Sequence, residues 1–165
     1  MAEFAATLIT LVGLGGTSIA VSSALYRLAR EVKTSNKDIK LLGMRFRIVG
    51  DSLRLVKSQF QDICAKPESS TVIQYLEDNR LAKHLSDMCQ LLTERMQDFA
   101  SQLRRLPTEN GIGANIRRTF WVIFKKPEIK ELHPEIEFVM STITMLMSAV
   151  QLEVAMERGT DADTM

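Results

Sequence analysis

Residues 4–26 read FAATLITLVGLGGTSIAVSSALY, a run of 23 residues without a charged side chain. At ~1.5 Å per residue a helix of this length extends ~35 Å, enough to cross the ~30 Å hydrocarbon core of a bilayer. Its apolar side chains alternate with glycine, serine and threonine, so membrane insertion would be only marginally favourable. The composition therefore indicates a helix that is poised between a protein core and a membrane.

Small residues divide this run. Gly13, Gly15 and Gly16 each cost a helix ~1 kcal/mol relative to alanine, so we expect a kink or break there, with Gly15 and Gly16 separating two short helices. Gly16, Ala20 and Ala24 fall four residues apart, a row that lets another helix approach closely. This row could pack against another helix inside the same fold, or it could form a contact within an oligomer or a membrane.

Three later segments place an apolar residue at every third or fourth position, which is typical of helices that bury one face. Pro67 and Pro107 end the first two segments, and Pro134 should kink the third or make it restart. The sequence thus predicts an all-α fold, a helical bundle of about four long helices plus short helices, with an apolar N-terminal helix. The predicted core positions are Ile39, Leu42, Phe46, Val49, Leu53, Val56, Phe60 and Ile63, then Leu81, Leu85, Met88, Leu92, Met96, Phe99, Leu103 and Leu106, and finally Ile129, Leu132, Ile136, Val139, Ile143, Leu146 and Val150.

Shorter elements complete the expected domain. A short helix should begin near Thr71 and end before Asn79, and residues 108–115 read as the longest loop. Residues 116–124 should form a short helix that caps the bundle with Trp121 and two phenylalanines. We expect one helical domain over residues 1–157 and a frayed polar tail over residues 158–165.

Composition restricts the class of protein. An apolar fraction of 45%, a charged fraction of 25% and a net charge of +1 are ordinary for a globular chain of 165 residues and give no general case for nucleic-acid binding. Cys64 and Cys89 lie in helical patterns and read as buried reduced thiols, which favours the cytoplasm. A secretory signal is the alternative for the N-terminus, but Glu3 replaces the cationic region that such signals carry.

Motifs for catalysis are missing from the sequence. Gly13, Gly15 and Gly16 match neither the dinucleotide fingerprint nor a P-loop. His84 and His133 have no ligand partners at metal-site spacing. We therefore expect no enzyme activity, no cofactor and no metal.

Cations gather in two places although the net charge is small. One group directly follows the apolar run, and the other surrounds the expected loop. Each cation close to an anionic membrane surface is worth ~1 kcal/mol, so both groups are candidates for lipid headgroups; a solvated, salt-bridged rim is the alternative. The candidate headgroup contacts are Arg27, Arg30, Lys33, Arg117, Arg118, Lys125 and Lys126.

Residues 1–42, with Lys37, Asp38 and Ile39 at a helix start, and residues 120–151, with Trp121 before a Lys-Lys pair and a Ser-Thr-rich apolar run at 141–147, resemble the fungal HeLo-like N-terminal domain. The resemblance implies an α-helical effector of cell death in fungal incompatibility and immunity-like systems. Such domains usually precede NACHT, NB-ARC or ankyrin modules or are triggered by amyloid-forming partners. They are similar to the four-helix bundle of the mixed-lineage kinase domain-like pseudokinase, which oligomerises and damages the plasma membrane.

The leading hypothesis is therefore a cytoplasmic bundle that oligomerises, moves to the plasma membrane and inserts its N-terminal helix. Its expected partners are anionic lipids, further copies of itself, and a receptor or amyloid-forming signalling protein. A signalling or adaptor module that binds partner helices and never enters lipid is the alternative. The expected membrane-targeting residues are Phe4, Leu8, Leu11, Leu14, Ile19 and Val21.

Overall fold

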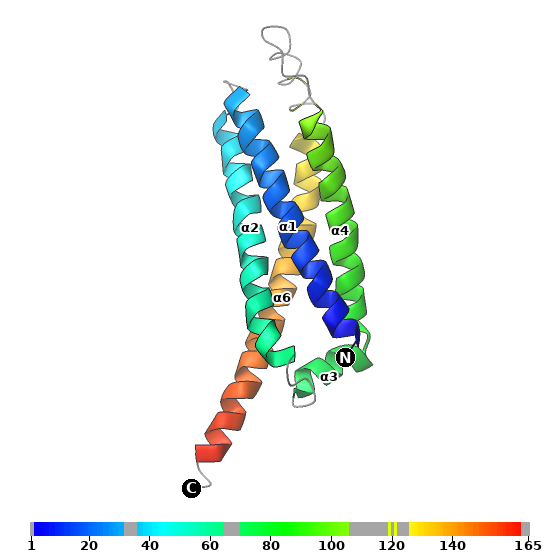
Figure 1. The fold of residues 1–165 in the computed structure, drawn as a ribbon, viewed down its shortest axis with the longest axis vertical. Helices are drawn as coiled ribbons and strands as arrows, with labels where there is room; N and C mark the ends of the chain where they lie inside the picture. Colours follow the sequence, from blue (N-terminus) through cyan, green and yellow to red (C-terminus); the bar gives the residue numbers. More distant parts are fainter. Residues whose placement is uncertain are drawn as a thin grey trace.

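The computed structural model describes residues 2–31, 36–64, 70–105, 119, 121 and 126–162. Within these residues the chain is all-α, as the sequence predicts, and forms a helical bundle (Figure 1). Its helices are α1 (Ala2–Glu31), α2 (Asn36–Cys64), α3 (Thr71–Asp78), α4 (Leu81–Arg104) and α6 (Lys126–Ala162).

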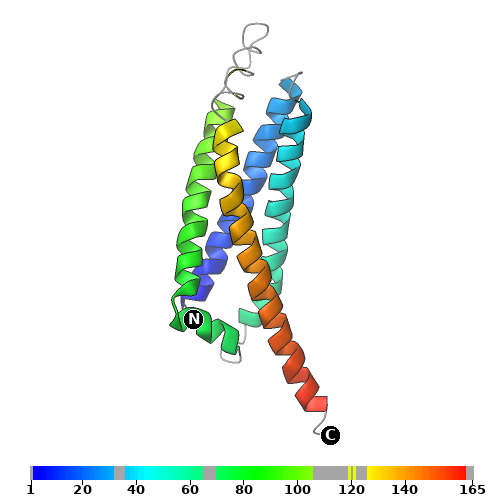
Figure 2. The ribbon, with the colours of Figure 1, turned by 180° about the vertical axis from the view of Figure 1, so that it is seen from behind.

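The four long helices alternate in direction. In Figure 1, α1 and α4 run upward while α2 and α6 run downward, and the short α3 lies across the lower end beside the N-terminus. α1 packs between α2 and α4, and α6 lies on the opposite side of the bundle, which Figure 2 shows from behind. The last turns of α6 project beyond the bundle.

The predicted apolar stripes form the core. On α2 the residues seven apart, Ile39, Phe46, Leu53 and Phe60, are buried, and Leu42, Val49 and Val56 are half-buried against them. On α4 the exception among the described side chains is Leu81, which is exposed because Ala82 takes the inward position of the first turn. Two predicted core positions, Leu106 and the side chain of Ile63, lie outside the described part of the chain. On α6 the core positions are Ile129, Leu132, Ile136, Val139, Ile143, Met147 and Val150, with Leu146 half-buried.

Three local expectations are wrong. α1 continues through Gly13, Gly15 and Gly16 without a break, because its packing between two helices outweighs the weak helix propensity of glycine. α6 continues through the exposed Pro134, so the expected restart of the helix does not occur there. The expected frayed tail is helical as far as Ala162.

Other expectations have mixed outcomes. The short helix near Thr71 is confirmed as α3. Trp121 is buried, as expected of a capping aromatic residue. The expected loop at 108–115, and all of the predicted helix at 116–124 except residues 119 and 121, lie outside the described residues.

Glu153 of α6 links the end of this helix to the start of α3 by hydrogen bonds. Its carboxylate accepts hydrogen bonds from the Ser70 hydroxyl at 2.7 Å, from the Thr71 backbone N–H at 2.6 Å and from the Thr71 hydroxyl. Partial burial raises the pKa of Glu153, but these hydrogen bonds outweigh it and hold the pKa below its usual value. Ser70 is also the N-cap of α3, so one carboxylate organises the turn that enters α3.

We predict that Glu153→Gln lowers the free energy of unfolding by about 1 kcal/mol at pH 7, because a neutral amide accepts weaker hydrogen bonds than a carboxylate. The folded-state pKa is depressed, so the stabilisation exists above the ordinary glutamate pKa of ~4.3 and is lost as the pH falls through the lower folded value. Urea unfolding at a series of pH values should show the two proteins converging in acid. A difference that stays constant with pH, or equals that of the exposed Glu131→Gln control, would contradict this role.

Candidate functional site: helix α1 and its seat

α1 is the apolar helix that the sequence singled out, and it is the most enclosed of the long apolar helices. Glu3–Arg30 of α1 and Pro127–Met156 of α6 are both long and apolar enough to cross a membrane, by length and composition only. In the apolar window of α1, 44% of the residues are buried, against 22% for α6. Burial of this kind is also what the core helix of a soluble bundle requires.

The expected membrane-targeting residues point into the bundle. Phe4, Leu11, Leu14 and Val21 are buried. Leu8 and Ile19 are half-buried. The Phe4 ring packs edge-on against the Phe60 ring, with centroids 5.3 Å apart. These side chains are therefore core residues in this structure. Lipid could reach them only after α1 leaves its position between α2 and α4, which we call the seat of α1.

Glycines set the distance between α1 and α2. A Cβ added at Gly50 would lie 2.6 Å from Ile19 Cγ1 and 2.8 Å from the Gly15 carbonyl oxygen, and one added at Gly15 would lie 3.1 Å from Leu53 Cβ. These distances leave no room for a larger side chain at Gly50. The glycines that the sequence suggested as helix breakers thus include one, Gly15, that joins two helices.

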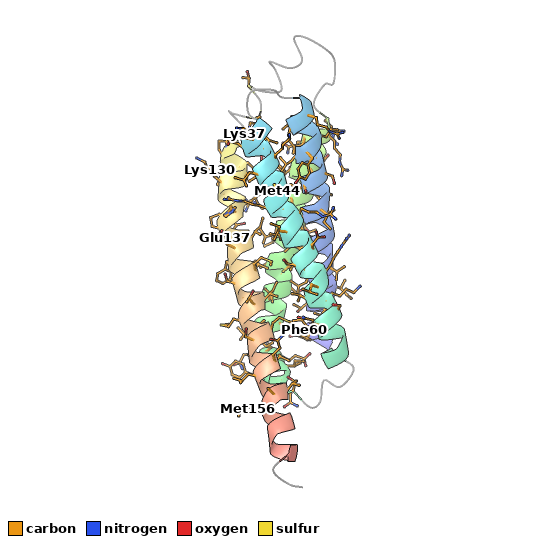
Figure 3. All side chains as sticks on the ribbon, turned by 90° about the vertical axis from the view of Figure 1, so that its left-hand side faces the viewer. Lys37, Met44, Phe60, Lys130, Glu137 and Met156 are labelled. Atoms are coloured by element: carbon orange, nitrogen blue, oxygen red, sulfur yellow. The ribbon has the colours of Figure 1, made fainter. Side chains whose placement is uncertain are left out.

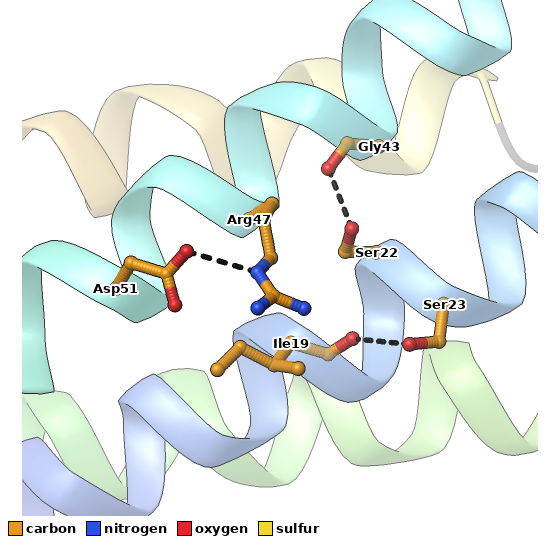
Figure 4. A network of polar contacts seen from close by, with 6 residues as sticks. All are labelled: Ile19, Ser22, Ser23, Gly43, Arg47 and Asp51. Atoms are coloured by element: carbon orange, nitrogen blue, oxygen red, sulfur yellow. Dashed lines mark hydrogen bonds and ion pairs between the residues drawn. The ribbon is translucent and has the colours of Figure 1, made fainter.

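Hydroxyl groups on α1 find partners both within the helix and across the interface. Ser22 Oγ donates to the Gly43 carbonyl of α2 at 2.7 Å, next to the exposed Arg47–Asp51 ion pair (Figure 4). Thr7 Oγ1 lies 2.8 Å from the Ala82 carbonyl of α4 and also 2.8 Å from the Glu3 carbonyl of its own helix. The hydroxyls of Thr10, Thr17, Ser18 and Ser23 bond carbonyls three or four residues earlier on α1, and Thr10 Oγ1 also lies 3.3 Å from Ser86 Oγ of α4.

The predicted small-residue row lies beside α4. Ala24 is buried and Ala20 is half-buried, whereas a Cβ at Gly16 would meet no atom within 4 Å. Gly16, Thr17 and Ala20 line a shallow hollow of ≈ 260 Å³ with residues of α4. Among the glycines, the tightest contact between α1 and another helix is therefore the one between Gly15 and Gly50, one position away from the row.

Few of the candidate headgroup cations fall among the described side chains. Arg30 is exposed near the end of α1, and Arg27 is half-buried, with Nη2 donating to the Leu103 carbonyl at 3.4 Å. Lys126 begins α6, although only its backbone is described. Lys33, Arg117, Arg118 and Lys125 lie outside the described residues.

The sequence analysis missed the exposed face of α6 as a second candidate surface. Apolar hollows flank this helix: one of ≈ 580 Å³ is bordered by α1, α3 and α4, one of ≈ 380 Å³ by α2, and a second of ≈ 580 Å³ by α4. A sliding hydropathy window over residues 127–156 would have found this helix, since it passes the same length and composition test as α1.

Groups that could support catalysis are sparse. Burial raises the pKa of Cys89 to about 12, so its thiol stays protonated and is a poor nucleophile. His133 lies 3.4 Å from Arg45 Nη1 and 3.3 Å from the Glu137 carboxylate, at an exposed position between α2 and α6. Among the described residues no group of three or more histidine, cysteine or acidic side chains could hold a metal ion.

Comparisons with family models, with curated proteins and with solved structures each gave no match to this chain.

We predict that Gly50→Ala lowers the free energy of unfolding by roughly 1–3 kcal/mol, because the new methyl group would overpack the α1–α2 contact. Gly16→Ala is the matched control: it adds the same methyl group where no atom lies within 4 Å, so it should stabilise the protein by up to ~1 kcal/mol through helix propensity. Chemical denaturation of the two variants checks the pair. If both substitutions stabilise the bundle, the contact between Gly15 and Gly50 does not determine how closely α1 packs against α2.

Proposed function

We propose that this chain is a membrane-targeting effector domain that induces cell death, in which oligomerisation releases α1 from the bundle for insertion into a membrane. The resemblance to the HeLo-like domain supports the cell-death role and the setting in a fungal incompatibility or immune-type system. The observation that carries the membrane step is the uncharged 23-residue run within α1, most of whose hydroxyl groups have partners within their own helix.

Internal hydrogen bonding matters because a bilayer core offers no water to polar groups. Thr10, Thr17, Ser18 and Ser23 already donate to carbonyls of α1 and would keep those bonds in lipid. Ser22 loses the Gly43 carbonyl when α1 leaves, but a serine in a helix can donate to the carbonyl four residues earlier. These five hydroxyl groups can therefore all be hydrogen-bonded within α1 when the helix moves from the bundle into lipid.

Release of α1 has a high cost in the isolated domain. The helix packs against both α2 and α4, and its departure would expose the apolar side chains of the common core. A trigger must offset that cost, and contacts with other copies, with anionic lipid or with a receptor or amyloid-forming partner are the candidates. Arg30, which is exposed close to the C-terminal end of α1, supports an attraction to anionic headgroups, whereas Arg27 is half-buried and donates to the Leu103 carbonyl.

The test is leakage of dye from vesicles that contain anionic lipid. Gly16 lies next to the centre of the uncharged run, is exposed and faces open space, so Gly16→Asp should leave the bundle folded. A charge near the bilayer centre costs a helix ~3 kcal/mol, which corresponds to about hundredfold weaker insertion. We predict that Gly16→Asp suppresses leakage while its thermal unfolding stays close to that of the original chain.

Gly16→Leu is the matched control, because it fills the same space with an apolar side chain and should keep or increase leakage. If Gly16→Asp and Gly16→Leu leak vesicles equally, α1 does not enter the membrane. Intact vesicles with the original chain, under conditions in which it oligomerises, would contradict the proposal as a whole.

The burial of α1 also favours a second candidate, a signalling or adaptor module that never enters lipid. A helix with 44% of its apolar window buried already serves the core, and the hollows beside α6 could receive a partner helix. Such a module would bind its partner with an affinity that does not depend on lipid charge.

A further inference from the structure

Two exposed helix faces carry large apolar side chains at spacings of three, four or seven residues. Each side chain is more than half exposed, and together they form most of the large exposed apolar side chains among the described residues. The α2 stripe consists of Leu41, Met44, Ile48 and Leu55, and the α6 stripe consists of Phe138, Met145, Leu152 and Met156.

These stripes lie opposite the buried series of their helices, at the edges of the hollows that flank α6: Ile48 borders the hollow between α2 and α6, and Phe138 and Met145 border the hollow that α6 forms with α1, α3 and α4. Residues seven apart share one side of a helix, and the α2 stripe lies roughly opposite the buried series that runs from Ile39 to Phe60. The α6 stripe is likewise opposite the series that runs from Ile129 to Val150. In Figure 3, which views α2 and α6 side by side, Met44 and Met156 mark the two helices. Seven-residue spacing is the pattern that packs one helix against another.

The two helices carry opposite charge. Residues 37–60 of α2 contain six cations and two acids, and residues 127–156 of α6 contain five acids and one cation. Lys40 and Arg45 lie beside the α2 stripe, Asp51 lies between Ile48 and Leu55 and pairs with Arg47, and Glu131 lies seven residues before Phe138 in line with the α6 stripe. The two helices are therefore complementary in net charge, whereas a contact between two copies of α2 or two copies of α6 would bring like net charges together.

The stripes also lie at matching heights along the bundle. Arg45 Nη1 of α2 is 3.4 Å from His133 Nε2 of α6, and both helices run in the same direction. Counting from these two residues at ~1.5 Å per residue, Ile48 and Phe138 lie ~4.5 and ~7.5 Å along, and Leu55 and Met145 lie ~15 and ~18 Å along. The offset is ~3 Å for both pairs, so the stripes of two copies standing side by side would meet nearly in register.

We infer that a second copy of this chain docks its α6 stripe on the α2 stripe of the first. The contact is heterologous, since each copy uses a different face, and it therefore builds chains or rings rather than closed pairs. In such an assembly the α1 N-termini all lie at the same end of the bundles. This inference deepens the proposed function and rests on it for its purpose, because it supplies the oligomer from which α1 is released.

The test uses two variants of the full chain that each block one face. Ile48→Glu places an acid on the α2 stripe and Met145→Lys places a cation on the α6 stripe; the original side chains are 63% and 65% exposed, so both variants should fold. By sedimentation velocity the original chain should form species larger than dimers as its concentration rises, while each variant alone stays monomeric. An equimolar mixture of the two should form a dimer and stop there, because one intact α6 stripe meets one intact α2 stripe.

Leu91→Glu is the matched control, since Leu91 is 62% exposed on α4 and belongs to neither stripe; it should assemble like the original chain. Assembly of either variant alone, or a mixture that stays monomeric, would overturn the inference. The inference would also be overturned if the original chain is a monomer and the two variants lose binding to vesicles, because the stripes would then contact lipid. Vesicle leakage without any assembly overturns this inference and the oligomerisation step but leaves the membrane-targeting role of α1, whereas assembly without leakage overturns the membrane-targeting role and leaves this inference.

Discussion

The close approach of α1 and α2 at Gly15 and Gly50 is the constraint on which the rest of the bundle depends. A Cβ on Gly50 would lie 2.8 Å from the Gly15 carbonyl oxygen, so the two backbones come nearly into contact. This proximity lets Ser22 reach the Gly43 carbonyl and leaves α4 to cover the other side of α1. α6, which lacks such a contact and is flanked by apolar hollows, then closes the bundle more loosely.

The same small residues suit α1 to two environments. Glycine and serine allow a tight seat in the protein, and they keep the helix free of charge and of long polar side chains that a bilayer would exclude. The cost of leaving the bundle is large because the core is shared with α2 and α4. α1 is thus held as a core helix at rest, and any membrane activity requires assembly or binding to supply the free energy that the seat provides.

Much of the fold was predictable, because periodic apolar residues such as Ile39, Phe46 and Leu53 bury one helix face wherever that helix lies. The continuity of α1 was not, since Gly13 and Gly15 weaken an isolated helix and only the structure shows that Gly15 allows close packing against α2. The exposure of Pro134 on α6 likewise depends on how that helix packs, which the sequence does not show. Of the candidate site, the apolar run was found from sequence, but which of its side chains face the core, and the exposed stripe on α6, required the structure.

If α1 leaves the bundle for a membrane, a single labelled residue of α1 can be followed from one environment to the other. A fluorophore on Gly16→Cys, with Cys64→Ser so that the only other cysteine is the buried Cys89, reports its surroundings by emission and by quenching from lipids brominated at known depths. The account predicts water-like emission in solution, and blue-shifted emission with the strongest quenching from the bilayer centre once anionic vesicles are added. Emission that stays water-like on bound vesicles, with no quenching from the bilayer centre, would contradict it.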